Sequence, residues 1–125
     1  MIKKVQKEWG YEKWIVNTEK YCGKLLYLKK GKRCSLHHHA FKDETFYVLN
    51  GKVLMEIGII IDMKEKIMVA GDSQRIKPNT DHRFNGLEES AIIEFSTHHE
   101  DGDSYRMVGQ LSGDVPQDIM EKYSK

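Results

Sequence analysis

Short runs of apolar and β-branched residues, separated by frequent glycines, dominate the pattern of this sequence. The runs have strand length and are rich in Val, Ile, Leu, Tyr and Phe. The candidate strands are residues 24–30, 45–49, 52–57, 59–61, 66–69 and 91–96. Many short strands at close spacing predict an all-β sandwich or barrel.

Two local signals add a turn and a helix to this picture. Asn50-Gly51 lies between two candidate strands and predicts a hairpin, because a type I′ turn needs positive φ at both central positions. Residues 114–123 are the best case for a helix, with Asp114 as a cap, Pro116 near the first turn and apolar residues on one face. We expect a short C-terminal helix that covers the sheet.

Length, charge and cysteine content limit the classes of protein that the chain can belong to. At 125 residues, with 39% apolar and 31% charged positions, it fits one domain over residues 1–125. Acidic and basic residues are evenly mixed around a formal charge of +1, which argues against a nucleic-acid partner. No stretch resembles a secretory signal or could cross a bilayer, so we expect a cytoplasmic protein without a membrane partner. Cys22 and Cys34 are not in a C-x-x-C arrangement and predict two reduced thiols.

Three consecutive histidines, His37, His38 and His39, are the first candidates for chemistry. In an extended strand, side chains alternate between the two faces. His37 and His39 are therefore expected on one face, and Cys34 and His38 on the other. Only two of the three imidazoles can converge on one point.

Two further side chains could complete a metal site around His37 and His39. A tight connection after the histidines would bring Glu44 to the same face, and His82 follows a turn-rich segment that would aim it at the same place. Three imidazoles and one carboxylate suit one divalent transition metal, either manganese, iron, nickel, cobalt or zinc. If they do not converge, the histidines form only a solvated loop, as we expect for the separate pair at residues 98–99.

The spacing of these residues resembles the two motifs of the cupin superfamily. The first motif, G-x5-H-x-H-x4-E-x6-G, is matched by Gly31, His37, His39, Glu44 and Gly51. In the second motif, Gly71, Pro78 and His82 match, and Asn79 stands where the family usually has glycine. Asn tolerates the left-handed backbone conformation, so the departure is mild. The resemblance implies a single-domain cupin, a double-stranded β-helix or jelly-roll barrel over residues 20–108, with the metal at its mouth.

A finer resemblance concerns Lys42 and Glu94. Lys42 lies two residues before Glu44, and the resulting H-x-H-x-x-K-x-E resembles the metal motif of the D-lyxose isomerase group; the related cupin-type phosphomannose isomerases carry a basic residue at this position. Strand alternation puts Lys42 beside the metal, where it could stabilise an enediolate; a lysine that reaches solvent from a strand end is the equal alternative. The stretch from Glu94 to Arg106 is similar to a segment of these isomerases in which the glutamate moves the proton. If Glu94 points inward it could act as general base, and if it points outward it is a solvated carboxylate.

These resemblances imply a metal-dependent aldose–ketose isomerase for a sugar or sugar phosphate, with Glu94 and Lys42 as catalytic residues. Three arginines could contact a phosphate, although a surface position is the simpler interpretation of each: Arg33, Arg83 and Arg106. An iron-dependent dioxygenase or a non-catalytic binding cupin would fit the same metal ligands. Cupins of this size are often dimers, and residues 91–96 are apolar on both faces, so we expect a homodimer.

Overall fold

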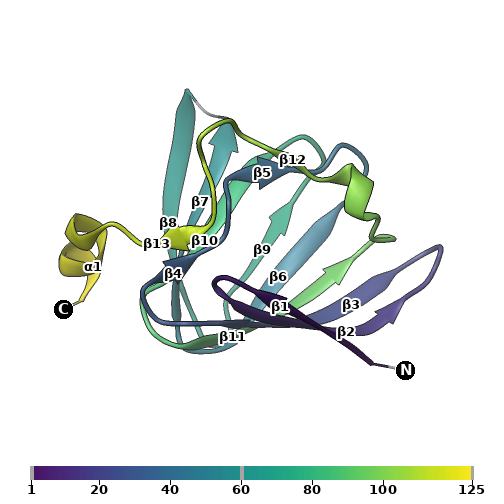
Figure 1. Ribbon diagram of the computed structural model, residues 1–125, viewed down its shortest axis with the longest axis horizontal. Helices are drawn as coiled ribbons and strands as arrows, with labels where there is room; N and C mark the ends of the chain where they lie inside the picture. Colours follow the sequence, from purple (N-terminus) through teal and green to yellow (C-terminus); the bar gives the residue numbers. More distant parts are fainter. Residues whose placement is uncertain (1, 60, 125) are drawn as a thin grey trace.

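The computed structural model describes residues 2–59 and 61–124, which fold into two antiparallel sheets that face each other (Figure 1). The first sheet has the spatial order β1 (Lys3–Lys7), β2 (Gly10–Asn17), β3 (Cys22–Leu28), β11 (Ser90–Ser96), β6 (Glu44–Asn50) and β9 (Ser73–Ile76). The predicted all-β fold is confirmed. β1 and β2 extend this sheet ahead of residue 20.

The second sheet is centred on β10 (Asp81–Gly86). Two short strands, β4 (Lys32–Arg33) and β5 (His37–His38), pair with one edge of β10, and β7 (Lys52–Ile59) pairs with the other. The sheet is completed by β8 (Asp62–Val69) beside β7, β12 (Tyr105–Arg106) beside β5 and β13 (Gly113–Asp114) beside β4. A 3-10 helix, η1 (Asp101–Asp103), precedes β12.

The space between the sheets is apolar over most of its length and polar at one end. The apolar core comprises Trp9, Leu26, Leu28, Cys34, Phe46, Val48, Val53, Met55, Met68, Ile76, Phe84 and Ile92. The polar end buries Lys24, Lys42, Glu44, His82 and Glu94. Burying charged groups is costly, and even a paired buried charge seldom adds to stability, so the polar side chains at this end contribute little to the stability of the barrel.

Most candidate strands are confirmed, and one is not. The runs at residues 24–30, 45–49, 52–57, 66–69 and 91–96 lie within or overlap β3, β6, β7, β8 and β11. The run at residues 59–61 is not a separate strand: Ile59 ends β7, residue 60 lies outside the described residues, and Ile61 is in a turn.

The predicted hairpin at Asn50-Gly51 is wrong. β6 pairs with β11 and β9, whereas β7 pairs with β10 and β8, so the turn carries the chain from one sheet to the other. Gly51 has φ +96°, but Asn50 does not have the positive φ that a type I′ turn requires. Its Oδ1 instead accepts a hydrogen bond from Ala91 N, which fixes the corner against β11.

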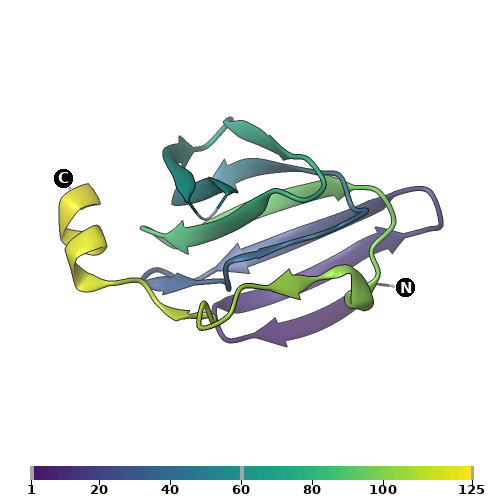
Figure 2. The same cartoon turned by 90° about the horizontal axis from the view of Figure 1, so that it is seen from above.

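The C-terminal helix is confirmed as α1 (Gln117–Tyr123), but it does not cover a sheet. It has no buried residue and projects from one end of the barrel (Figures 1 and 2). Pro116 occupies the N-cap position, and Asp114, the expected cap, lies in β13 with its carboxylate 2.5 Å from Lys32 Nζ. Within the described residues, no helix is long and apolar enough to span a membrane.

Candidate metal centre and catalytic cavity

Three histidines converge at the polar end of the barrel. His37 of β5 is paired directly with His82 of β10, and His39 follows β5, so the short strand delivers two of the imidazoles. One ring nitrogen from each of the three lies within 4.8 Å of the corresponding nitrogens of the others. These three histidines could therefore hold a metal ion.

Backbone carbonyls orient all three imidazole rings. The Nδ1 atoms of His37, His39 and His82 lie 2.8, 2.7 and 3.1 Å from the carbonyl oxygens of Ser35, Asp103 and Thr80. A carbonyl can only accept, so each Nδ1 carries a proton, and Nε2 is the ring nitrogen left to face the centre. This is the arrangement by which proteins usually present histidine to a metal.

Glu44 adds a carboxylate to the three imidazoles. Its Oε2 lies 3.1 Å from His82 Nε2 and 3.4 Å from His39 Nε2. Among the described residues, Glu44 Oε2 and His82 Nε2 are buried without a hydrogen-bond partner of good geometry. Two unsatisfied buried atoms that face the same point fit a cation at that point.

The electrostatics of the site favour the metal-binding forms of Glu44, His37 and His39, whereas at His82 the effect of burial is outweighed by Glu44, which raises the pKa of His82. Burial opposes ionisation of Glu44, but the close contact with His82, together with the charge of Lys42, lowers the pKa of Glu44 to about 2. Burial, helped by the charge of His82, lowers the pKa of His37 to about 3. Burial also lowers the pKa of His39. At neutral pH, the site thus presents a carboxylate and at least two neutral imidazoles, the forms that bind metals.

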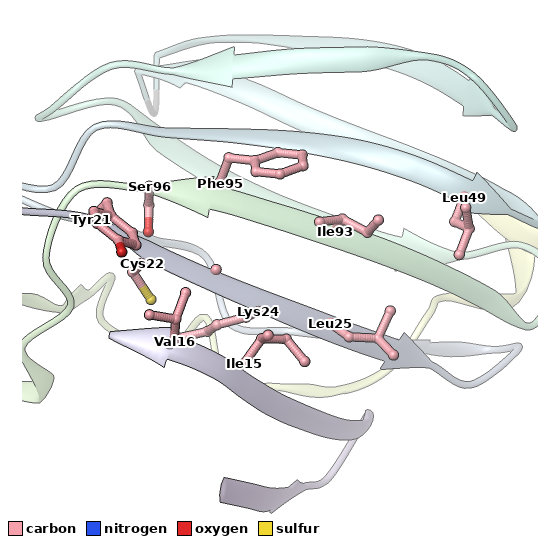
Figure 3. Close-up of a pocket in the computed structure, with 11 residues that line it drawn as sticks. Ile15, Val16, Tyr21, Cys22, Lys24, Leu25, Leu49, Ile93, Phe95 and Ser96 are labelled. Carbon is pink, nitrogen blue, oxygen red and sulfur yellow. The ribbon is translucent and has the colours of Figure 1, made fainter. Parts of the chain in front are cut away.

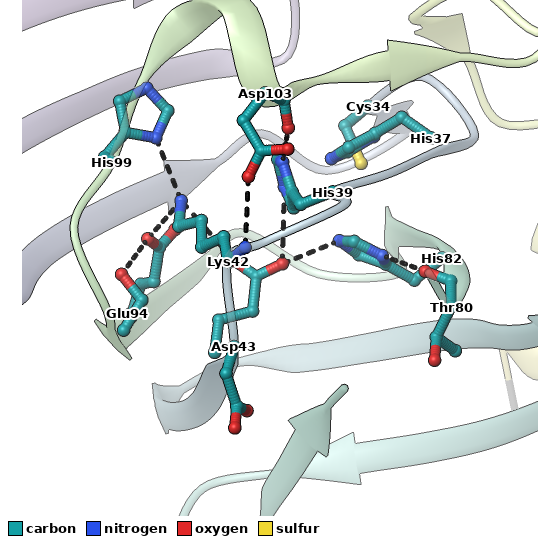
Figure 4. A network of polar contacts seen from close by, with 12 residues as sticks. Cys34, His37, His39, Lys42, Asp43, Thr80, His82, Glu94, His99 and Asp103 are labelled. Carbon is teal, nitrogen blue, oxygen red and sulfur yellow. Dashed lines mark hydrogen bonds and ion pairs between the residues drawn. The ribbon is translucent and has the colours of Figure 1, made fainter. Parts of the chain in front are cut away.

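Lys42 and Glu94 form a buried ion pair next to this centre. Lys42 Nζ lies 2.7 Å from Glu94 Oε2 and 3.6 Å from Glu44 Oε1, and both Lys42 and Glu94 are only 4% exposed (Figure 4). Burial disfavours the ammonium, but Glu94 and Glu44 outweigh it and raise the pKa of Lys42. Ser96 Oγ donates a second hydrogen bond to Glu94. Glu94 therefore points into the barrel, which is the inward of the two orientations that the sequence left open.

His99 extends this ion pair toward solvent. Lys42 Nζ lies 3.0 Å from His99 Nδ1, and His99 Nε2 lies 2.9 Å from Asp101 Oδ1. Burial and the charges of Lys42 and Lys24 lower the pKa of His99, so its neutral ring accepts from Lys42 and donates to Asp101. The expectation that residues 98–99 form a loop is correct, but the interpretation of His99 as lying apart from the site was wrong.

Asp103 was missed from the sequence altogether. Its carboxylate accepts hydrogen bonds from the backbone N–H groups of Ala40 (2.8 Å), Phe41 (3.2 and 3.3 Å) and Lys42 (3.0 Å). Its carbonyl accepts the bond from His39, and Figure 4 shows Asp103 between His39 and Lys42. One residue thus fixes the loop that connects His39 to Lys42. The only sequence signal for it was the acidic character of residues 100–103.

The centre opens into a cavity of about 450 Å³ between the sheets. His37, His39 and Glu44 of the centre line it, together with Trp9, Phe46 and Phe84 of the core. Trp14, Lys24 and residues of the strands β1 and β12 complete the lining. A cavity of this size with a few convergent polar groups suits a small molecule.

Other predicted positions are placed away from the centre. His38 faces outward, as expected, with Nδ1 3.0 Å from Asp81 Oδ1. Cys34 lines the same cavity as His37, contrary to expectation, because residues 34–36 form no strand and the alternation lapses there. Cys22 and Cys34 are free thiols, and burial raises the pKa of Cys34 to about 12.

The three arginines differ in position. Arg83 is buried and donates to Cys34 O, Gln110 Oε1 and Leu111 O, so it is neither a surface residue nor part of the cavity. Arg33 does not line the cavity, and Arg106 does.

A second hollow lies on the outer face of the first sheet and is almost wholly apolar (Figure 3). It is lined mainly by Ile15, Val16, Tyr21, Leu25, Leu49, Ile93 and Phe95. It contains no convergent acid, base or metal ligand among the described residues, so it is not a candidate for catalysis.

Solved structures share the fold of the chain at low sequence identity. The capsular polysaccharide assembling protein CapF from Staphylococcus aureus matches with a TM-score of 0.72 and 15% identity, over 86% of this chain and 32% of CapF. KdgF from Halomonas sp. matches with a TM-score of 0.66 and 20% identity, over 74% of this chain and 81% of KdgF. A Bacillus subtilis oxalate decarboxylase matches with a TM-score of 0.74 and 18% identity, over 85% of this chain and 30% of the decarboxylase. These likenesses support the fold.

Sequence comparison gives a finer placement. A D-lyxose/D-mannose isomerase from Thermosediminibacter oceani is 33% identical over 110 residues, covering 69% of this chain and 61% of the isomerase, so the chain spans about three fifths of that relative's length. The family model described as Cupin domain matches residues 24–98, which include the three converging histidines, Glu44, Lys42 and Glu94. With more than half of its length matched and both motifs in place, the chain belongs to the cupin family.

Proposed function

We propose that this cupin is a metal-dependent aldose–ketose isomerase that acts on a sugar or sugar phosphate through an enediolate. The observation that carries the proposal is the buried ion pair of Lys42 and Glu94 beside the converging histidine nitrogens. A buried ion pair in a cavity contributes little to stability, and such groups are frequent at catalytic sites. The D-lyxose/D-mannose isomerase relative supports a sugar as the substrate.

The ligands of the metal would be His37, His39, Glu44 and His82. A divalent ion bound there supplies a Lewis acid for the carbonyl and neighbouring hydroxyl oxygens of an open-chain sugar. The ligand set accepts manganese, iron, nickel, cobalt or zinc.

Glu94 is the group that moves the proton. Its carboxylate removes the proton from C2 of the aldose, the C–H electrons form the C1–C2 double bond, and the carbonyl electrons move to O1. The protonated Glu94 then returns the proton to C1, and a proton passes from O2 to O1 to give the ketose. Lys42 places its ammonium beside the developing negative charge, which lowers the barrier because the groups are already in position and shielded from water.

The alternatives use less of the site. An iron-dependent dioxygenase or a non-catalytic binding cupin needs the ligands but gives no role to the Lys42–Glu94 pair. The isomerase uses both.

The test combines metal analysis with proton exchange. The purified protein should contain a stoichiometric metal and should introduce deuterium at C1 or C2 of one sugar in deuterated water, as detected by NMR across free and phosphorylated aldoses and ketoses. Glu94→Gln should retain the metal and lose exchange by at least about 100-fold, whereas the exposed Glu100→Gln should match the wild type. Metal-loaded protein that exchanges no sugar would refute the isomerase.

We further propose that the protein works as a homodimer. The apolar hollow on the outer face of β3, β11 and β6, with Phe95 58% exposed, supports burial of this face in an assembly.

A further inference from the structure

The cavity has an outer part formed by an edge strand from each sheet. Lys3 and Lys7 of β1 and Arg106 of β12 line it. Figure 2 shows β1 and β12 along the same side of the molecule, in purple and light green. The two strands thus bring basic side chains to the opening from both walls.

Strand pairing shows that Lys3 faces inward. Residues paired directly across neighbouring strands share a face of the sheet. Trp14 pairs with Lys3 on one side and with Lys24 on the other, and Lys24 pairs with the buried Glu94. Both ammonium groups lie over the Trp14 ring, with Lys3 Nζ at 4.5 Å and Lys24 Nζ at 4.2 Å from its centroid. Lys3 therefore belongs to the same inward row as the proton-transfer residue.

Arg106 faces inward by the same reasoning. It pairs with His37, which pairs in turn with His82, so its guanidinium is in the row that carries two proposed metal ligands. Directly paired residues have Cβ atoms about 5 Å apart. Arg106 therefore lies next to the metal-facing wall, at its outer end.

The carboxylates and the outer cations of the lining differ in their direct contacts. Each carboxylate of the cavity wall contacts a donor or cation of the chain: Glu8 contacts Ser112, Glu12 contacts Trp14 and Lys24, Glu44 contacts His82, Glu94 contacts Lys42 and Asp101 contacts His99. The side chains of Lys3, Lys7 and Arg106 make no ion pair or hydrogen bond with any residue that the structure describes. The outer part of the cavity thus offers three cations that no carboxylate of the described residues contacts directly, so that a ligand could contact them.

We propose that this outer part binds an anionic group, a phosphate or a carboxylate, at the end of the sugar remote from the reacting carbons. The inference rests on the proposed function for the identity of the sugar, but the anion site itself rests on the inward rows and the available cations. Arg106 contacts two oxygens of the anion in the planar geometry that guanidinium groups favour, and Lys3 and Lys7 add charge.

Calorimetric titration of the purified protein with inorganic phosphate, at low ionic strength, tests the site without requiring turnover. Arg106→Gln should weaken phosphate binding by about tenfold or more, as expected for removal of a charge-assisted contact, and Lys3→Gln by about threefold. Lys4→Gln is the matched control, because Lys4 is on the same strand but points to the outer face, over the ring of Tyr11. It should leave phosphate affinity within about twofold of the wild type, the usual scatter of a remote surface change.

A parallel titration with acetate separates the two sources of negative charge. Phosphate binding without acetate binding favours a phosphate ester, and comparable binding of both shows that the site also accepts a carboxylate; either supports the site. Equal weakening by Lys4→Gln and Arg106→Gln, or phosphate affinity that Arg106→Gln leaves unchanged, would overturn it, including the case in which phosphate binds only at the metal. If the phosphate titration contradicts the anion site, the proposed isomerisation of free sugars can still hold. If no sugar exchanges its proton, the result of the phosphate titration still stands, so the two proposals can fail separately.

Discussion

Asp103 provides the sharpest test of how the centre is held together. Its carboxylate accepts three consecutive backbone N–H groups from residues 40–42, while its carbonyl accepts the bond from His39. Asp103→Asn keeps the size of the side chain but replaces one acceptor oxygen by a donor. At least one of the three N–H groups then loses its acceptor and faces an NH₂ group instead.

The magnitude follows from the number of bonds affected. One part-buried donor left unsatisfied costs about 1–3 kcal/mol, and the remaining bonds lose the extra strength that a charged acceptor gives. We expect the free energy of unfolding to fall by about 2–4 kcal/mol in urea. The loop from His39 to Lys42 is anchored by this carboxylate, so metal affinity should fall about 10- to 100-fold, the usual effect of losing a group that supports a metal ligand.

A neighbouring residue supplies the control. Asp101 belongs to the same η1 turn, but its side chain is exposed and, within the described part of the chain, is hydrogen-bonded to His99 alone, so Asp101→Asn should change metal affinity and stability little. Urea unfolding of the metal-free protein and metal titration of both variants make the comparison. Unchanged stability and metal affinity in Asp103→Asn, or an equal loss in Asp101→Asn, would refute the anchoring role.

Three further predictions concern pH, backbone geometry and assembly. The pKa of His37 falls from 6.5 to about 3 on folding, so the unfolded chain binds more protons than the folded chain between these pH values. The free energy of unfolding of the metal-free protein should therefore fall as the pH drops below 6.5. His37→Gln should flatten the pH dependence of that free energy, measured by urea unfolding, between about pH 6.5 and 4.5. Gly51→Ala should lower the free energy of unfolding by at least about 2 kcal/mol, because φ is +96° and the added Cβ would lie 2.2 Å from Ser90 Oγ. Gly31→Ala, at φ +81° with nothing within 4 Å of the added Cβ, should lower it by about 1 kcal/mol. Equal losses of stability in denaturation experiments would contradict the clash at Gly51. Phe95→Asp should convert the proposed homodimer to a monomer in light scattering, and a wild-type monomer would refute that assembly.

The sequence carried enough information to predict the convergence of the three histidines, for a physical reason. Strand alternation put His37 and His39 on one face, and β5 pairs with β10 so that His37 lies directly opposite His82. The prediction that Asn79 can replace the usual glycine because Asn tolerates the left-handed conformation is also confirmed, since Asn79 has φ +64°. The shared face of His37 and His39 and the conformation of Asn79 depend on local backbone geometry, which the sequence records within a few residues, whereas the approach of His82 joins distant parts of the chain and was supported by the resemblance to the two cupin motifs.

The hairpin and several strands could not be read in the same way. Asn50-Gly51 has the composition of a hairpin turn, but the pairing of β6 with β11 is decided by contacts some forty residues away in the chain. The short strands β4, β5, β12 and β13 are two residues each, too short for any periodicity to reveal them. Their partners in space, and not their own residues, make them strands.

The groups that orient the metal ligands were hidden for a different reason. The imidazoles of His37 and His82 are held by the carbonyls of Ser35 and Thr80, and every residue type offers a carbonyl, so no residue identity marks these contacts. Asp103 acts through its side chain as well, and it could have been sought by asking what accepts the three N–H groups of residues 40–42 that no strand partner satisfies. That question has an answer more than sixty residues away, in an acidic loop without periodicity, so the need for an acceptor was predictable while its identity required the fold.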